Sequence, residues 1–482
     1  MSEARSPAAG RPLGRTLVLL ALAQLIYSLD LNIVFVALPE IGAELGFPGQ
    51  TQQLVVSAYV VFAGGFLLFG GRAADLLGRR RVFVLALAIY AVSSLAGGLA
   101  TSPEVIVIAR AVQGIGGALL LPSTLSLINT LFAEGPQRNR ALAVWGGAGA
   151  SGLTLGALLG GVLTENFGWP AVFYVNVPLA GLVALAALAV IPRDTPRAQR
   201  RRFDLPGSLT VTGGATLLVF ALVEGPELGW TSPLVTGAFL LAATLLAAFA
   251  AIEARSPDPL MPFRLFGNRS LTVALSVTFI YMATFGVLPY FLTVLMQSVH
   301  GFSALQTGLA FLVPSLAIAT GTQLGERLTT RIGTRTTLLI GFAIGVVGTA
   351  ALAYGFEADA SYAQLIPGLV ISGVGQGIVW TAMWIAAATG TPAHEQGVAN
   401  GIAATALNIG NAIGLAVFTV IADIGIDGAT GQELRTATAD GEFIVVLLTA
   451  AGMAIGLLIT LFLPRHPTPT PETKPEHAGI SA

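Results

Sequence analysis

The sequence predicts an all-α polytopic membrane protein, and three observations support this fold class. Only 10% of the 482 residues are charged and 54% are apolar, with a mean hydropathy of +0.79. Thirteen stretches of at least 18 residues contain no Asp, Glu, Lys or Arg, which is the length that a helix needs to cross a bilayer. The basic residues fall in alternate connections between these stretches. Because soluble domains carry about 25% charged residues, a soluble globular protein is excluded.

A fourteenth apolar segment, 16–39, contains only Asp30 as a charged residue and is the first predicted span. It is too long for a cleaved signal peptide, and no small-residue cleavage site of the A-x-A type follows it. The other predicted spans are 45–71, 82–103, 111–133, 141–164, 166–192, 205–223, 228–252, 270–299, 301–325, 336–356, 360–393, 396–422 and 443–464.

The orientation follows from the distribution of positive charge. Threading fourteen helices with the N-terminus inside places 22 of the 24 Lys and Arg residues on the cytoplasmic side, as the positive-inside rule requires. Arg435 falls outside, and Arg110 falls within the fourth span. We therefore expect both termini in the cytoplasm. The near absence of Lys beside so many Arg residues indicates a GC-rich genome, and thus a bacterial inner membrane.

Several classes of function are not expected, because the residues or motifs that they require are absent from the sequence. With no Cys, the chain has no disulfide framework, thiolate metal site or Cys nucleophile. A net charge of −1 provides no basic excess for nucleic acid. The sequence contains no H-E-x-x-H, no G-x-S-x-G and no Walker loop, so neither an enzyme nor a nucleotide-driven pump is expected. No cofactor or metal is expected either.

Two charged residues remain within predicted spans. Asp30 lies about eight residues from the outer end of its span and Arg110 about seven from the outer start of its own, so both sit roughly 10–12 Å below the outer surface. An ionisable side chain in a membrane helix is costly unless it is paired or hydrated. Equal depth and opposite sign predict a shared polar cavity. Asp30 then takes up and releases a proton under the influence of Arg110, or the pair only locks two helices together.

Internal repeats point to a secondary transporter. The joint 71–81 after the second span and the joint 325–335 after the tenth both run from Gly through a short polar stretch to a second Gly and basic residues. Segments 114–117 and 373–376 echo one another with the same offset of eight helices. Two six-helix halves with two inserted central helices produce this offset, and an internally repeated bundle is typical of secondary transporters.

These motifs resemble those of the major facilitator superfamily, and within it the 14-span drug:proton antiporter family. Segment 71–81 is similar to the family signature G-x-L-A-D-x-x-G-R-R/K-R/K. Segment 29–39 resembles L-D-x-T-I-V-N-V-A-L-P, from which Asn32 and Phe35 depart, and segment 110–114 resembles R-x-x-Q-G. The resemblance implies two six-helix bundles that alternate in opening a central cavity to either side. It implies an inner gate in which Asp75 lies near a helix N-terminus, and the gate residues are Gly71, Asp75, Gly78, Arg79 and Arg80.

The fifth span carries a weaker match. The family signature G-x-x-x-G-P-x-x-G-G keeps its glycine spacing here at Gly152, Gly156 and Gly160, but Ala157 replaces its Pro. A Pro would kink the helix, so we expect this helix to be straight. The glycine face serves antiport or simply a tight helix contact. Whether the chain exchanges protons for its substrate or carries both in one direction therefore rests on the family resemblance.

The predicted organisation divides the chain into five parts. They are a cytoplasmic tail over 1–15, an N-terminal six-helix bundle over 16–192, two additional helices with their connections over 193–264, a C-terminal six-helix bundle over 265–463 and a disordered cytoplasmic tail over 464–482. Pro289 and Pro314 are expected to mark bends. The outer loop 423–442 is expected to be a linker or a lid.

Polar and aromatic residues on apolar helices are the candidates for a substrate cavity, although each could instead link helices. Asp30 is the one carboxylate expected deep in the bundle, with Glu224 a marginal case. An anion beside aromatic rings suits amphipathic or cationic compounds. The cavity candidates are Gln24, Asn32, Gln113, Tyr281, Tyr290, Gln297, Gln376, Trp380, Trp384, Asn408 and Asn411.

The leading prediction is a proton-coupled exporter of small amphipathic drugs or antibiotics that works by alternating access, as a monomer in the lipid bilayer. Its partners are then the bilayer, the small-molecule substrate and protons. The main alternative is a facilitator that exports or imports a specific metabolite. A membrane enzyme and a non-transporting receptor are weaker alternatives, because catalytic motifs are absent from the sequence.

Overall fold

The computed structural model describes most of the chain as helices and the turns between them. Fourteen helical segments in the described part are long and apolar enough to cross a membrane, and they correspond in order to the fourteen predicted spans. No strand occurs among the described residues. The described residues are 13–47, 51–194, 204–256, 259, 261, 263–392, 395–424 and 430–464.

The first six spans form one bundle. Within it, α1 packs along α5, α2 along α4, and α3 along both α4 and α7. The sixth span is divided, because a short helix α6 precedes α7. The helices are α1 (Leu13–Leu45), α2 (Leu54–Leu77), α3 (Arg79–Gly98), α4 (Pro103–Leu131), α5 (Pro136–Phe167), α6 (Ala171–Tyr174) and α7 (Asn176–Val190), with a 3₁₀ turn η1 (Thr51–Gln53) before α2.

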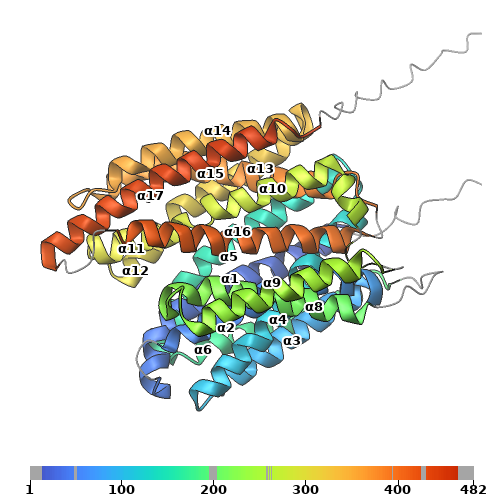
Figure 1. Cartoon of the computed structure of the whole chain (residues 1–482), viewed down its shortest axis with the longest axis horizontal. Coiled ribbons are helices and arrows are strands. Elements are labelled where there is room, and N and C mark those ends of the chain that lie inside the picture. Colours follow the sequence, from blue (N-terminus) through green and yellow to red (C-terminus); the bar gives the residue numbers. More distant parts are fainter. Residues whose placement is uncertain are drawn as a thin grey trace, which may run out of the picture.

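The last six spans form a second bundle, in which α10 packs on α16, and α13 and α14 both pack on α15. Figure 1 shows α14, α15 and α17 at the top, α2, α3 and α4 at the bottom, and α16 between them. The helices of this bundle are α10 (Arg269–Thr284), α11 (Leu288–Val294), α12 (Ala304–Ala310), α13 (Leu312–Ile332), α14 (Thr334–Leu352), α15 (Tyr362–Ala388), α16 (Gln396–Ala422) and α17 (Gly431–Thr460). Short turns of other helix types occur at η2 (Phe263–Gly267), η3 (Leu295–Val299) and η4 (Ala353–Gly355).

Both expected proline bends are breaks in the structure. The ninth span stops at Thr284 and resumes as α11 with Pro289 in its first turn. The tenth span is interrupted between α12 and α13, and Pro314 lies in the first turn of α13. Pro314 has no N–H to donate to the carbonyl four residues earlier, and that carbonyl, on Ala310, accepts a hydrogen bond from the Tyr362 hydroxyl at 2.6 Å instead.

The two bundles repeat the same helix pairs. The pair α2–α4 in the first corresponds to α13–α15 in the second, and α1–α5 corresponds to α10–α16. At the predicted repeated joints, Gly78 (φ +104°) separates α2 from α3, and Gly333 (φ +83°) separates α13 from α14. Both backbones lie in the left-handed region that favours glycine. We call the end of the molecule that carries these joints the inner end and the opposite end the outer end.

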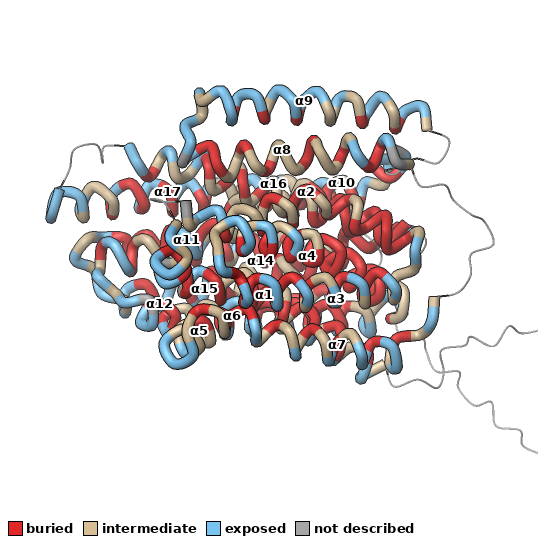
Figure 2. Tube along the Cα trace, turned by 90° about the horizontal axis from the view of Figure 1, so that it is seen from below, coloured by how far each residue is buried: buried red, intermediate tan, exposed pale blue. Residues whose placement is uncertain are grey.

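The inserted helices α8 (Leu205–Leu228) and α9 (Pro233–Glu253) lie outside both bundles. The first of them, α8, contacts α2 of one bundle and α16 of the other, whereas α9 packs mainly on α8. Gly64 and Gly65 of α2 make room for Val219 and Thr216 of α8. Figure 2 shows α9 as the outermost row with many exposed residues. Only 22% of its most apolar window is buried, against 72% for α15, so α9 presents an apolar surface suited to lipid.

Candidate functional site

The two charges predicted within the membrane form an ion pair inside the first bundle. Arg110 on α4 donates from Nη1 to Asp30 Oδ2 on α1 at 2.6 Å, and the side chains are 1% and 0% exposed. The pair therefore lies in the packed interior of one bundle, where each charge has the other as its partner.

Neutral side chains complete the environment of the Asp30 carboxylate. Its Oδ1 accepts hydrogen bonds from the amide nitrogens of Gln113 at 2.9 Å and Asn176 at 2.8 Å. Gln113 also donates to Ser94 at 2.9 Å, and the ring of Tyr59 lies 4.3 Å from the Arg110 guanidinium carbon. A buried network in which the carboxylate accepts three hydrogen bonds holds one arrangement firmly. We call Asp30, Arg110, Gln113, Asn176 and Ser94 the charged network.

Part of this network could not be expected from the sequence. Gln113 was expected to line the cavity, but it is fully buried among these partners. Asn176 and Tyr59 were not singled out. The available signal for Asn176 was an amide side chain inside an otherwise apolar predicted span at 166–192, which in a membrane bundle indicates a hydrogen-bonding partner.

The glycine face of α5 packs against the helix that carries Asp30. A Cβ at Gly152 would lie 2.5 Å from the Leu25 carbonyl oxygen, and one at Gly156 would lie 2.3 Å from that of Leu29. Gly160 is also buried. The helix α5 is continuous from Pro136 to Phe167, and the side chain of Ala157 lies outside the described part. Continuity does not test the expected straightness, because α4 is also continuous although it contains Pro122. The glycines thus make a tight helix contact, one residue away from the proton-carrier candidate.

The gate motif joins the two bundles at the inner end. The backbone N–H of Val398, in the first turn of α16, donates to Asp75 Oδ2 at 2.9 Å. Asp75 also pairs with Arg79 at 3.4 Å, and a Cβ at Gly71 would lie 2.3 Å from the Gly397 carbonyl oxygen. The carboxylate of one bundle therefore caps the positive N-terminal end of a helix of the other.

Other polar contacts reinforce this inner closure and were missing from the sequence prediction. Asn129 at the end of α4 donates to Gln396 at 3.1 Å and to Asn400 at 3.4 Å, and Asn139 on α5 donates to Thr330 on α13 at 3.2 Å. All three bonds connect the first bundle to the second, so the structure is closed at the inner end.

The basic residues after Gly78 have a separate role in the structure. The Asp194 carboxylate accepts the backbone N–H groups of Arg80 and Arg81, each at 3.1 Å. The side chain of Arg80 reaches the Leu188 carbonyl oxygen at the end of α7. These contacts fasten the start of α3 to the chain that follows α7.

An aromatic cluster lies where α5 meets α15. The indoles of Trp145 and Trp380 are nearly parallel, with centroids 5.9 Å apart and 11° between planes. Trp384 stands nearly perpendicular to both, at 5.8 Å and 5.9 Å. Tyr281 lies 5.6 Å from Trp380 and beside Gln376. The structure thus brings together four predicted cavity residues, Tyr281, Gln376, Trp380 and Trp384. It adds Trp145, which nothing in its apolar predicted span distinguished. We call Trp145, Trp380 and Trp384 the tryptophan cluster.

The other cavity candidates do not converge on one place. Gln24 bonds Ser28 on its own helix at 3.2 Å, and Asn408 bonds the carbonyl of Ala404 at 3.0 Å. Asn32 links α1 to α5 through the Leu153 carbonyl at 3.0 Å. Of these three, only Asn32 links two helices, whereas Gln24 and Asn408 bond within their own helix. The remaining candidates are half-buried or more exposed: Tyr290 at 46% exposure, Gln297 and Asn411.

The expectation of a single deep carboxylate is wrong. Glu442 on α17 is 1% exposed, and its Oε2 accepts no hydrogen bond from a described residue. Glu224 is buried as well, at 7%. Glu442 was expected in the outer loop 423–442, because charge-free windows end at a charged residue. Most of that loop is the first part of α17, which begins at Gly431, and residues 425–429 lie outside the described part.

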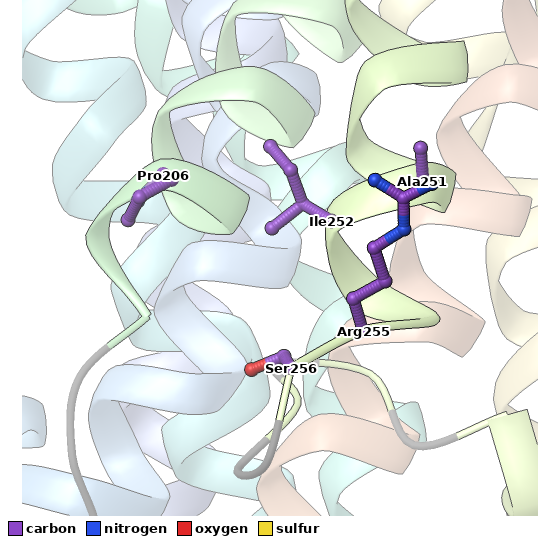
Figure 3. A pocket seen from close by; sticks show the side chains of 5 residues that line it. All are labelled: Pro206, Ala251, Ile252, Arg255 and Ser256. Carbon is purple, nitrogen blue, oxygen red and sulfur yellow. The ribbon is translucent and has the colours of Figure 1, made fainter.

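A shallow hollow of about 390 Å³ opens where α8 begins and α9 ends (Figure 3). It is lined by Pro206, Ala251, Ile252, Arg255 and Ser256. None of these residues belongs to the charged network or to the tryptophan cluster. The hollow belongs to the inserted pair of helices and lies outside the two bundles.

Comparison with known proteins identifies the family. The family model described as Major Facilitator Superfamily matches residues 20–415 and 273–482. The chain belongs to the major facilitator superfamily. It is 37% identical to the puromycin resistance protein pur8 of Streptomyces alboniger over 92% of this chain and 88% of that protein. It is 38% identical to the cephamycin export protein CmcT of Amycolatopsis lactamdurans, over 86% of each.

Solved structures share the fold of this superfamily protein. The human organic anion transporter MFSD10 superposes with a TM-score of 0.68 at 19% identity, covering 93% of this chain and 99% of that one. The proton:xylose symporter XylE superposes with a TM-score of 0.67 at 14% identity, covering 94% and 96%. At these identities the likeness shows the fold alone, and it agrees with the predicted all-α architecture of two bundles.

Proposed function

We propose that the protein exports small amphipathic drugs or antibiotics across a bacterial inner membrane by alternating access, in exchange for protons. The observation that carries this proposal is the Asp30–Arg110 pair, an ion pair enclosed in a membrane bundle. Relatives named for resistance to puromycin and lincomycin and for export of cephamycin support the class of substrate. The arginine-rich inner end faces the cytoplasm in this proposal, and the protein works as a monomer.

The moving parts are the two bundles, which we assign to residues 16–192 and 265–463. Residues 193–264 contribute α8, which contacts both bundles along α2 and α16. In the described conformation the inner end is closed by the Asp75 cap on α16 and by the amide contacts of Asn129. Closure of the inner end is what an exporter needs while it releases substrate outward and collects a proton.

Protonation of Asp30 would change the charged network at its centre. The ionised carboxylate accepts three hydrogen bonds, from Arg110, Gln113 and Asn176. The neutral acid attracts the guanidinium far less, which leaves Arg110 charged and poorly compensated. Arg110 also bonds the Val55 carbonyl of α2 at 3.1 Å, so a shift of Arg110 alters the packing of α1, α2 and α4 together.

A mechanical route leads from this network to the bundle interface. Asp30 lies on α1, and the turn that precedes it packs on Gly152 and Gly156 of α5. The same α5 contacts α13 and α15 of the second bundle. A displacement of α1 is thereby transmitted to the helix that meets the other bundle, since close-packed helices cannot move independently.

Reconstituted proteoliposomes test the proposal. Puromycin is added on one side with and without a pH gradient, and both drug movement and internal pH are followed. Antiport moves protons against the direction of the drug, so the sign of the pH change separates it from symport. Asp30→Asn should abolish gradient-driven transport while Asp30→Glu retains part of it. Full gradient-driven transport by Asp30→Asn, in a protein that elutes as wild type, would refute the proton role.

A further inference from the structure

The tryptophan cluster spans the boundary between the bundles. Trp145 belongs to α5 of the first bundle, whereas Trp380 and Trp384 belong to α15 of the second. Trp145 is 0% exposed and Trp384 2%, and Trp380 is partly buried. The parallel indoles of Trp145 and Trp380 form two opposing walls, and the perpendicular Trp384 closes a third side.

The indole N–H groups of the tryptophan cluster are all buried and donate to no described protein atom. A buried Trp N–H normally has an acceptor. Most other buried polar groups in the described structure have a partner. Three unpaired donors at one place therefore indicate a surface that could bind the hydrogen-bond acceptors of a ligand. Tyr281 extends this surface on the side of the second bundle, 5.6 Å from Trp380.

The fit between the two walls depends on a glycine. A Cβ at Gly146 would lie 2.7 Å from Cδ1 and Nε1 of Trp380, so the absent side chain is what lets the indole of α15 reach α5. Because the walls sit on different bundles, separation of the bundles at the inner end pulls the stack apart. At a centroid separation of 5.9 Å the two indoles leave no room for a third ring between them, which needs about 7–8 Å. A ligand ring can therefore enter only where one indole has moved away.

We propose that the tryptophan cluster is the closed form of a binding site for planar aromatic molecules that carry a hydrogen-bond acceptor, such as a carbonyl oxygen, at the ring edge. When the inner end opens, the substrate takes the place of one indole in the stack, and its acceptor pairs with the free N–H groups. The inference rests on the proposed export function and specifies the substrate class. The same stack rebuilds itself when the substrate leaves, which favours closure of the inner end.

Equilibrium binding of doxorubicin, a planar anthraquinone with carbonyl oxygens, tests the inference. The full chain is placed in lipid nanodiscs without a pH gradient, and the anisotropy of the drug is followed against empty nanodiscs. Trp380→Leu and Trp145→Leu should each raise Kd about tenfold or more, through loss of the ring face. Trp380→Phe keeps a ring and loses the N–H, so we expect about a threefold rise.

A matched control is available at Trp230, which follows α8 and stacks on Phe239 of α9. This contact belongs to the inserted pair of helices and not to the tryptophan cluster. Trp230→Leu should leave Kd within about twofold of wild type. If the Leu variants do not fold, the double variant Trp145→Phe, Trp380→Phe preserves packing and should still lose about tenfold. Wild-type affinity in the folded ring-loss variants, or in this double variant, overturns the inference.

A second arm tests from which side the site opens. Asp75→Asn weakens the inner closure, so the binding-competent state becomes more populated and the apparent Kd for doxorubicin should fall. An unchanged or higher Kd contradicts a site that opens at the inner end. Since binding is measured without a gradient, failure of the proton proposal leaves this assay unaffected. Conversely, proton-driven transport that survives loss of the tryptophan cluster overturns only the present inference.

Discussion

The two bundles share their helix packing but differ in their polar interiors. In the first, Gly152 and Gly156 of α5 approach the carbonyls of Leu25 and Leu29 on α1. In the second, a Cβ added at Gly410 or Gly414 of α16 would lie 2.3 Å or 2.5 Å from the carbonyl oxygen of Phe279 or Ala283 on α10. This equivalence places Thr284 at the position of Asp30. Among the described residues, Thr284 bonds the Ile280 carbonyl and, more weakly, that of Tyr281 on its own helix, at 2.6 Å and 3.4 Å.

The rest of the charged network has neutral counterparts too. The echo of segment 114–117 in segment 373–376 places Leu369 at the position of Arg110 and Ser372 at that of Gln113. Where Gln113 bonds Ser94, Ser372 bonds Thr349 at 3.0 Å. At these equivalent positions one interior carries an ion pair and the other carries hydroxyl groups, and the buried Glu442 of the second bundle lies on α17 rather than at any of them. The small-residue contacts are therefore common to both halves, whereas the Asp30–Arg110 ion pair belongs to the first.

The largest expected effect comes from making the first bundle resemble the second. Arg110→Leu alone leaves Asp30 buried without its cation, which should cost about 3–5 kcal/mol of stability. The double variant Asp30→Thr, Arg110→Leu should recover most of that loss, because no charge remains to be buried. Thermal unfolding in detergent measures both. The double variant should nevertheless show no gradient-driven transport.

If the double variant is as unstable as Arg110→Leu, the charged network is required for packing, and the two bundles are not equivalent in this respect. Recovery of stability together with gradient-driven transport would break the assignment of the proton to Asp30.

The next largest effect tests the shared glycine contacts. Gly156→Ala and Gly414→Ala each place a methyl group against a backbone carbonyl, so both should lose about 1–3 kcal/mol of stability. Differential scanning fluorimetry should record similar shifts for the two variants. Gradient-driven transport should fall further in Gly156→Ala, because Leu29 adjoins Asp30. Equal transport losses would show that the two contacts serve only packing.

The smallest effect concerns the inner closure. Asp75→Asn removes a charged cap from α16, worth about 0.5–2 kcal/mol, and should expose the inner end more often. Thr329, at the equivalent position of the second bundle, serves as the matched control, and Thr329→Ala should leave the closure nearly unchanged. Because the chain has no native Cys, a single Cys introduced at Ala399 of the wild type and each variant can report opening by its rate of alkylation. Equal alkylation rates in all three proteins would contradict the gate role of Asp75.

Much of the architecture was predictable because membrane-spanning helices can be recognised from short stretches of sequence. Charge-free length located fourteen spans, alternating arginines set the expected orientation, and repeated glycine joints indicated two related halves. Asp30 and Arg110 stood out because charges are rare in such helices, and their pairing followed from equal depth. The boundary error at Glu442 arose from the same rule, since a window defined by absence of charge cannot contain a buried carboxylate.

By itself, then, the sequence determined the number of helices, their division into two related halves and the two charges within the membrane, because each depends on residues close together in the chain or on simple depth. Only the tertiary structure decided that Asn176 completes the Asp30 site, that Val398 receives Asp75, and that Trp145 stacks on Trp380. These contacts join helices far apart in sequence, and their residues are unremarkable in their own helices. Rotation and crossing of packed helices choose such partners, and no local pattern records that choice.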